Sequence, residues 1–250
     1  MSLRGKQSNQ PQSMKKLLLS VMLCLAVSAG AQTYNFTTCS TTGRFGPDQT
    51  AVDAEYLATN LNGLVTINTQ GIQEWVVPYT GLYSIQAVGA SGGNSTWSTL
   101  RLGGNGSDIK GEFMLTAGQV VQILVGQAGE TDAVGGGGGA SYVAIANVPQ
   151  IVAGGGGGAS SDQDGIASVI TNDGTMDSQN LFAGGTLGNG GAACMLVVNG
   201  NNGAGGGGFF TDGATPNSGS GNNGFGGLSF LNGGIGGQPG RLDLACNGDP

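Results

Sequence analysis

The fold is decided by residues 141–158, which read SYVAIANVPQIVAGGGGG. Two apolar, β-branched runs, 141–146 and 149–153, stand on either side of Asn147, a residue type that favours tight turns. This pattern predicts a β-hairpin. The second run passes without a polar spacer into five consecutive glycines. The sequence therefore places a β-strand and an oligoglycine run side by side in the chain.

Further β-strands are expected on the N-terminal side of this hairpin. Apolar and β-branched runs, several with period-two alternation, occupy 34–38, 64–68, 72–79, 82–88, 109–116 and 119–125. The dipeptide Ala117-Gly118 between the last two suits a tight hairpin turn. One helix is expected over 49–60, because Asp48 is a suitable N-cap and apolar residues recur at helical spacing. Many short strands separated by turn residues predict an all-β fold, a jelly-roll-like antiparallel sandwich.

Glycine dominates the second part of the chain. The sequence holds 52 glycines in 250 residues, most of them between 89 and 240. A flexible linker is one explanation of such a composition. Against it, the glycine runs adjoin apolar β stretches, charge is sparse, and large apolar residues recur as far as Ile235.

An ordered glycine-rich region has to be stabilised by its backbone, because it has few side chains to bury. Fixing each glycine costs about 0.5–1 kcal/mol more than fixing alanine. Polyproline-II strands without Cβ atoms can approach closely enough for amides to bond neighbouring carbonyls. The sequence therefore predicts a bundle of polyglycine helices, mainly within 89–240, inserted in the sandwich, whose strands lie mainly within 33–153.

The N-terminus has the features of an export signal. Residues 1–13 are polar and unpatterned and are expected to be an unstructured extension. Residues 14–31 follow the order basic, apolar, small-residue site, which is typical of a secretory signal peptide, and Met-Lys-Lys suits a bacterial one. The apolar run is too short for a membrane span. We expect cleavage after Ala31, one glycine-rich domain over 32–250 that is secreted or displayed at the cell surface, and further sequence beyond Pro250.

Charge and composition exclude several functions. Removal of residues 1–31 leaves four basic residues against all 15 acidic ones, a balance that repels phosphate backbones, so no nucleic-acid partner is expected. The chain has no histidine, which excludes the usual catalytic triads and His-ligated metal sites. The G-x-G-x-x-G matches at 203–208 and 219–224 lack a flanking strand and helix. Neither an enzyme nor a cofactor or metal site is predicted, and the acidic residues of 162–177 are interpreted as a solvated loop.

An ordered series of short motifs carries a family resemblance. The series is Phe36-Thr37-Thr38-Cys39, Gly43–Gln49, Ala54-Glu55-Tyr56, Gly71–Pro78, Tyr83-Ser84-Ile85, Gly89–Gly93, Ile123–Glu130, Gly139–Val143 and Ile151–Gly157. It resembles the glycine-rich extracellular domain of the anaplastic lymphoma kinase and leukocyte tyrosine kinase receptors. The resemblance implies a jelly-roll-like sandwich that carries a hexagonal bundle of glycine helices, and a role in binding a small protein ligand. The kinase half is not implied, because the chain lacks Asp-Phe-Gly and any histidine.

One departure from the family concerns the cysteines. The family has a second cysteine about 13 residues after the first, and this position is Val52 here. Cys39 therefore lacks its family partner, and Cys194 with Cys246 is the expected disulfide.

Four aromatic residues in glycine-rich loops are candidate contact residues for a ligand: Trp97, Phe209, Phe210 and Phe225. The alternative is that they pack at the ends of the glycine bundle. The sequence thus predicts a non-catalytic binding or adhesion domain, with loops such as 94–102 and 209–232 contacting a protein or cell-surface ligand. A structural matrix or surface-layer protein without a specific ligand is the alternative.

Overall fold

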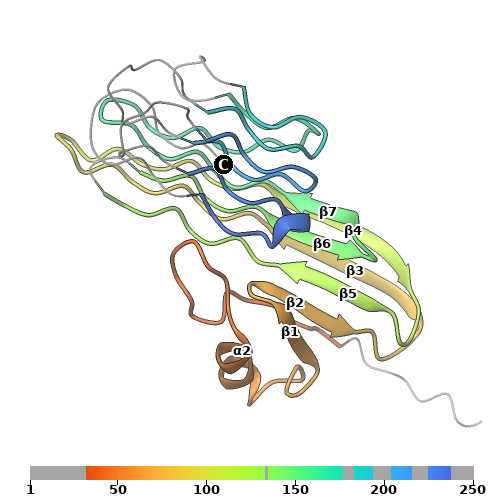
Figure 1. The fold of residues 1–250 in the computed structure, drawn as a ribbon. Helices are drawn as coiled ribbons and strands as arrows, with labels where there is room; N and C mark the ends of the chain where they lie inside the picture. The colour runs from red at the N-terminus through yellow and green to blue at the C-terminus, as the bar shows by residue number, and fades with distance from the viewer. Residues whose placement is uncertain (1–31, 133–134, 177–182, 194–203, 216–224, 238–250) are drawn as a thin grey trace, which may run out of the picture. The chain divides into compact units, whose positions relative to one another are not determined.

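The computed structural model describes residues 32–132, 135–176, 183–193, 204–215 and 225–237 (Figure 1). Contacts divide the chain into a short unit, Met1–Tyr34, and a large one, Asn35–Pro250. Everything below concerns the large unit. Its regular structure is mostly antiparallel β-sheet with little helix, so the all-β prediction is confirmed at that level.

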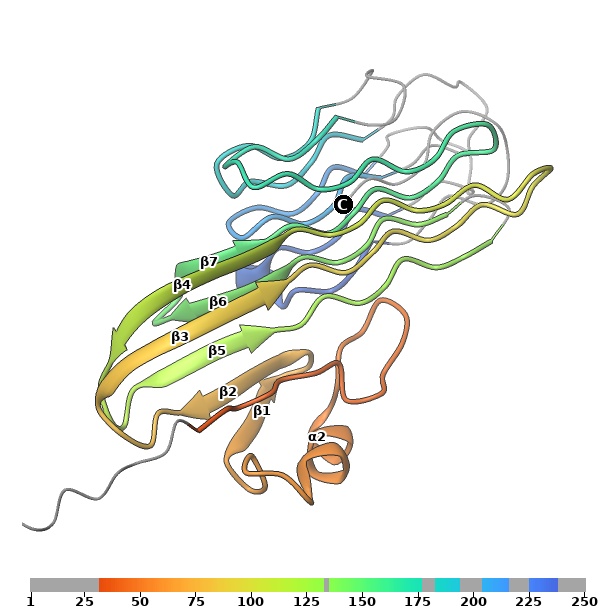
Figure 2. The ribbon, with the colours of Figure 1, turned by 180° about the vertical axis from the view of Figure 1, so that it is seen from behind.

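Two antiparallel sheets organise the unit (Figures 1 and 2). The five-stranded sheet has the order β1 (Val65–Thr69), β2 (Ile72–Val76), β5 (Val120–Leu124), β6 (Ser141–Ile145) and β7 (Val148–Ala153). The second sheet pairs β3 (Gly81–Val88) with β4 (Asp108–Leu115). Trp75 of β2 contacts Tyr83 of β3, with ring centroids 6.0 Å apart, so the two sheets pack on each other there.

The hairpin predicted around Asn147 is confirmed. β6 and β7 pair in the register Ser141↔Ala153 and Val143↔Ile151. Ala146 and Asn147 form the two-residue turn, both with positive φ, as a type I′ hairpin turn requires. The predicted helix start is also confirmed: α2 (Gln49–Tyr56) begins after Asp48, whose side chain accepts a hydrogen bond from the Ala51 amide at 2.9 Å.

Three local predictions are wrong. Residues 34–38 do not form a strand. The helix ends at Tyr56 instead of reaching residue 60. Ala117-Gly118 does not close a hairpin, because β4 and β5 belong to different sheets. At that point the chain crosses from one sheet to the other, and Gly118 donates a backbone hydrogen bond to Val77 while Val77 donates one to Gln119.

The glycine runs are held by backbone hydrogen bonds with a period of three residues. Gly135 and Gly138 donate to segment 156–159, whereas Gly136 and Gly139 donate to segment 127–130. The same spacing relates the bonds of Gly104 and Ser107 to segment 154–157. Residues three apart therefore share a face of the extended segment, and each bonded face has its own neighbour.

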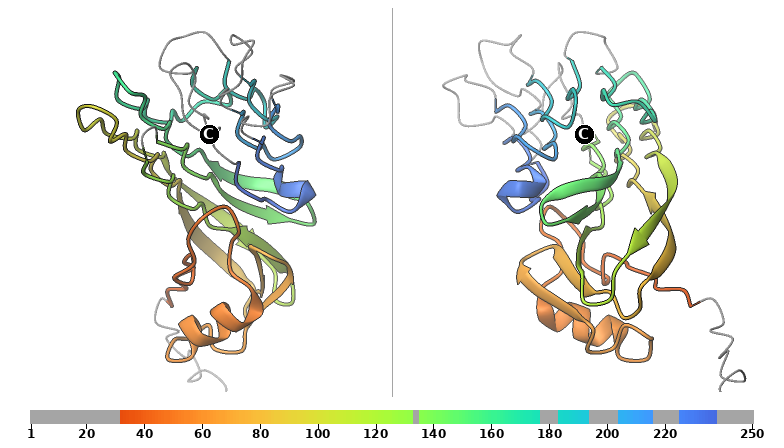
Figure 3. Two further views of the ribbon diagram at one scale, coloured as in Figure 1. Left: turned by 60° about the vertical axis from the view of Figure 1, so that its left-hand side comes forward. Right: turned by 90° about the vertical axis from the view of Figure 1, so that its right-hand side faces the viewer.

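These hydrogen bonds fall into two separate sets of segments. The first array comprises 89–93, 102–107, 126–130, 135–139, 154–159 and 165–168, and the second comprises 172–175, 183–192, 204–214, 226–230 and 235–237. Among the described residues, no backbone hydrogen bond joins one array to the other. The first array continues directly from strands of both sheets, as Figure 3 shows, because segments 89–93 and 154–159 follow β3 and β7.

The second array is attached to the five-stranded sheet through side chains. Ile72, Leu124, Tyr142 and Ala144 of the sheet form a buried cluster with Phe209 and Phe230. Phe230 begins the short helix η1 (Phe230–Asn232), and its ring stacks on Phe209 with centroids 4.8 Å apart. These two phenylalanines therefore join the second array to the sheet.

Close packing in the first array leaves no room for side chains at many glycines. A Cβ atom at Gly155 would overlap the carbonyl group of Gly138, and one at Gly92 would overlap that of Gly157. A Cβ atom at Gly81, by contrast, would meet nothing within 4 Å. The sequence requirement for glycine thus comes from the distance between neighbouring backbones.

We expect Gly155→Ala to destabilise the protein by about 3 kcal/mol, because the neighbouring backbone has to move to admit the methyl group. Gly81→Ala is the matched control and should change stability by less than about 0.5 kcal/mol. Urea unfolding of the two variants measures the difference. Equal stabilities would contradict close backbone packing.

Amide hydrogen exchange should follow the period of three within a single glycine run. The amides of Gly136, Gly138 and Gly139 donate hydrogen bonds and should exchange slowly. The Gly137 amide donates none to the described residues and should exchange much faster. Uniformly fast exchange over 135–139 would show that the run is a flexible linker.

Candidate binding surfaces

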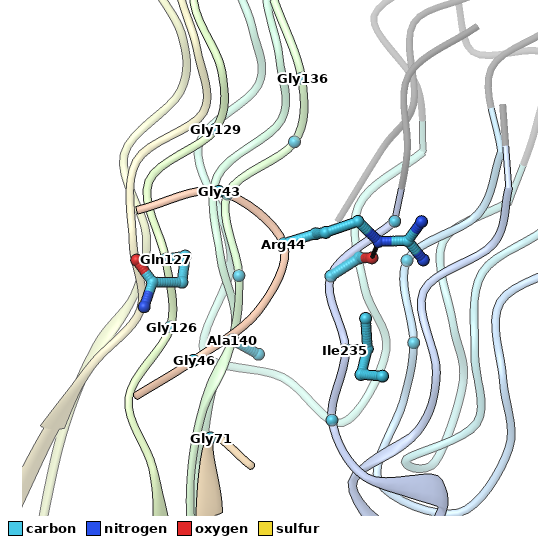
Figure 4. A pocket seen from close by; sticks show the side chains of 18 of the residues that line it. Gly43, Arg44, Gly46, Gly71, Gly126, Gln127, Gly129, Gly136, Ala140 and Ile235 are labelled. Carbon is cyan, nitrogen blue, oxygen red and sulfur yellow. Dashed lines mark hydrogen bonds between the residues drawn. The ribbon is translucent and has the colours of Figure 1, made fainter. Parts of the chain in front are cut away.

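A cavity of about 670 Å³ lies between the two arrays (Figure 4). Segments 126–130 and 136–140 form one wall, and segments 204–207 and 234–237 form the other. Loop 42–46 also lines the cavity. The walls are mostly glycine backbone, so the cavity presents amides and carbonyls more than side chains.

Arg44 spans this cavity from the loop to the second array, as Figure 4 shows. Its Nε donates a hydrogen bond to the Gly236 carbonyl at 3.1 Å, and the Gly236 amide donates to the Arg44 carbonyl at 2.8 Å. Its guanidinium group also lies over the Phe45 ring, 5.5 Å from the centroid. The approach of Gly46 to Gly71 positions the loop, since a Cβ on Gly46 would collide with the Gly71 Cα.

Two further side chains stabilise the second array. Tyr142 donates a hydrogen bond from its hydroxyl to the Gly207 carbonyl at 3.1 Å, and burial raises the pKa of this hydroxyl. Asp212 accepts hydrogen bonds from the Ser229 amide at 2.7 Å and the Asn232 side chain at 2.9 Å. The bond from the Ser229 amide is the main cause that lowers the pKa of Asp212, because it favours the carboxylate.

A second surface is the tip loop, residues 94–102, which projects beyond the strands at the end of the first array (Figures 1 and 2). Ser95 and Arg101 exchange two backbone hydrogen bonds of 3.0 Å, and Thr96 donates to Asp132 at 2.8 Å. The loop nevertheless exposes three large apolar side chains: Trp97 (52%), Leu100 (61%) and Leu102 (56%).

The four candidate aromatic residues occupy different environments. Phe209 is 1% exposed and belongs to the core that joins the second array to the sheet. Phe210 is exposed beside it, with ring centroids 5.0 Å apart. Phe225 is exposed at the cavity, whereas Trp97 is in the tip loop. The structure therefore does not gather them into one surface.

The expected disulfide partners, Cys194 and Cys246, lie outside the described residues. Cys39 is a buried free thiol. Burial raises its pKa, and its amide donates to the Thr37 hydroxyl at 3.0 Å. A thiol of this kind is protonated and poorly reactive at neutral pH.

Two acidic residues of the 162–177 loop accept hydrogen bonds from neighbouring residues. Asp162 accepts a hydrogen bond from the Ser160 hydroxyl at 2.8 Å, and Asp164 accepts one from the Leu102 amide at 2.9 Å. Among the described residues, no group of three or more potential ligands is placed to hold a metal ion. In the same part of the chain, no helix has the length and apolar character needed to cross a membrane.

Sequence reasoning missed Arg44, Asp212, Leu100 and Leu102. Leu100 and Leu102 carry no local signal beyond their place in a loop. Arg44 and Asp212 act through partners far along the chain, because Arg44 bonds a residue 192 positions away. Such partners become visible only in the fold.

Comparison with known proteins shows similarity to a receptor. No family model matches the chain. The mouse leukocyte tyrosine kinase receptor is 39% identical over 105 residues, which is 40% of this chain and 12% of the receptor. This similarity supports a distant relationship to that receptor family, confined to a small part of the receptor's length.

The Asp212 contacts should depend on pH. The folded-state pKa lies below the ordinary value of 3.8, so the stabilisation is complete above about pH 4 and is lost as the pH falls through the lowered pKa. We expect Asp212→Ala to speed hydrogen exchange of the Ser229 backbone amide and of the Asn232 side-chain amide at pH 7. Below the lowered pKa, the carboxyl group is protonated, and the exchange rates of the wild-type chain and the variant should become similar. An unchanged difference at low pH would contradict a role for the carboxylate charge.

Proposed function

We propose that this chain is a secreted or cell-surface, non-catalytic domain that binds a protein or cell-surface ligand. Support comes from its similarity to a protein named a receptor and from the motifs shared with the glycine-rich extracellular domain of that receptor family. The signal-like segment 14–31 favours export, in a version typical of bacteria. Because the match covers 12% of the receptor, we propose only a binding role and no kinase activity.

We further propose that the scaffold is a jelly-roll-like sandwich carrying polyproline-II helices of glycine. A polyproline-II helix has three residues per turn, and the period-three hydrogen bonds of segments 135–139 and 104–107 agree with that geometry. Such a scaffold is stiff for its side-chain content, because each segment is bonded to its neighbours through the backbone. Stiffness favours binding, since less entropy is lost when a presented loop contacts its partner.

The observation that carries the binding proposal is the tip loop. Trp97, Leu100 and Leu102 are more than half exposed, although their loop is fixed by backbone bonds at Ser95 and Thr96. Apolar side chains on a fixed loop bind a partner at low entropic cost, and tryptophan is enriched in binding hot spots. Their exposure has no structural benefit in the isolated chain, because burying them would be favourable.

The alternative is a structural matrix or surface-layer protein. The two glycine arrays favour it, since they make a rigid body without using a ligand. The two proposals differ in their partners. A binding domain saturates with one partner, whereas a structural protein associates with copies of itself.

The test compares exposed residues that lie in different parts of the fold. The chain from Gln32 onward is immobilised and exposed to secreted and cell-surface proteins of the organism that produces it. Trp97→Ala and Leu100→Ala should each weaken saturable binding about 30-fold, as loss of a hot-spot residue does. Leu57→Ala is the matched control, because Leu57, at the end of α2, is at least as exposed (68%) as the two tip-loop residues.

Equal binding by all three variants would contradict the role of the tip loop. Concentration-dependent self-association without any saturable partner would support the structural alternative instead. Sedimentation velocity measures the self-association of each chain, and it also shows whether a variant that does not bind is as compact as the wild-type chain.

A further inference from the structure

The cavity between the arrays is lined by first-array backbone that includes an amide with no hydrogen-bond partner among the described residues. In segment 135–139, Gly135 and Gly138 form one bonded face, and Gly136 and Gly139 form another. With a period of three, Gly137 and Ala140 form the third face. Both residues line the cavity, and the Gly137 amide donates no hydrogen bond to any described residue.

The opposite wall has the same character. In segment 205–208, Gly205 and Gly208 donate to Ala214 and Thr211 within the second array. Gly206 and Gly207 line the cavity, and their amides donate no hydrogen bond to any described residue. Both walls thus contain amides without a hydrogen-bond partner among the described residues, and with a period of three Gly206 and Gly207 lie on different faces of their segment. Elsewhere in both arrays, amides of this kind bond the carbonyls of a neighbouring extended segment.

The shape of the cavity restricts its ligand. Its volume of about 670 Å³ is typical of a ligand pocket. At the first wall, the side chain next to Gly137 on the same face is the small one of Ala140, so a ligand can approach the backbone closely there, whereas Arg44, Phe225 and Ile235 line other parts of the cavity. An extended peptide of small residues fits such walls, whereas β-branched side chains would hold its backbone too far away to accept the amides.

We propose that this cavity binds an extended peptide segment rich in glycine, alanine and serine, whose carbonyls accept hydrogen bonds from Gly137 on one wall and from Gly206 or Gly207 on the other. The segment would lie between the two arrays and bond to both. This site is separate from the tip loop and does not depend on it. Ordering a flexible peptide costs about 1–2 kcal/mol per residue, so a short peptide should bind weakly, with a Kd of roughly 0.1–1 mM.

The test uses the chain from Gln32 onward, uniformly labelled with ¹⁵N, and the blocked peptide Gly-Ala-Gly-Ser-Gly-Ala-Gly-Ser. Titration should shift the amide signals of Gly137, Gly206 and Gly207 saturably. It should also slow hydrogen exchange at least tenfold at Gly137 and at Gly206 or Gly207. A peptide with valine in place of alanine and serine should bind at least tenfold more weakly. Shifts confined to the tip loop, no saturable shift at about 10 mM peptide, or equal binding of the valine peptide would overturn the proposal.

A pair of leucine variants tests the location. Gly136 lines the cavity, and a Cβ there meets only the Glu130 backbone, at an ordinary distance of 3.4 Å. Gly136→Leu should therefore fold and weaken peptide binding at least tenfold. Gly81→Leu adds the same side chain at an open position away from the cavity and should bind the peptide like wild type. Unchanged binding by a folded Gly136→Leu variant would overturn the location, and the valine peptide decides the question if that variant does not fold.

Discussion

Contact between bare backbones is the constraint on which the rest of this structure depends. In the two arrays, amides of one extended segment bond carbonyls of the next, and positions such as Gly92 and Gly155 have no space for a Cβ atom. The hydrogen bonds offset the high conformational cost of ordering glycine. Close approach in turn excludes side chains, so composition and structure require each other throughout the two arrays.

The two arrays are attached to the sheets in different ways, and this difference creates the cavity. Segments of the first array continue β3, β5 and β7 without a break, so the sheets fix their spacing. The second array instead packs on the five-stranded sheet through Phe209 and Phe230, and Arg44 of loop 42–46 donates a hydrogen bond to Gly236. These few contacts fix the position of the second array and leave the cavity between the two arrays.

The sequence predicted the features that depend on neighbouring residues. The turn at Asn147 and the helix start at Asp48 follow from local backbone preferences, and both are correct. The hairpin predicted at Ala117-Gly118 is wrong, because the sequence of a tight turn is the same whether the turn joins paired strands or connects two sheets. Phe209 and Arg44 could not be placed from sequence, since their partners lie in segments distant along the chain.

In the first array, backbone hydrogen bonds form between parallel and between antiparallel segments. Gly156 and Ala159 bond Ala90 and Gly93 in a parallel sense, whereas the bonds from Gly104 and Ser107 to segment 154–157 run antiparallel. A β-sheet that reverses a strand must change its bonding pattern, but a three-fold extended segment offers similar faces in both orientations. A glycine-rich segment can therefore be lengthened, inserted or connected differently without changes in the sequence of its neighbours. Such a fold tolerates insertions and altered connections during evolution.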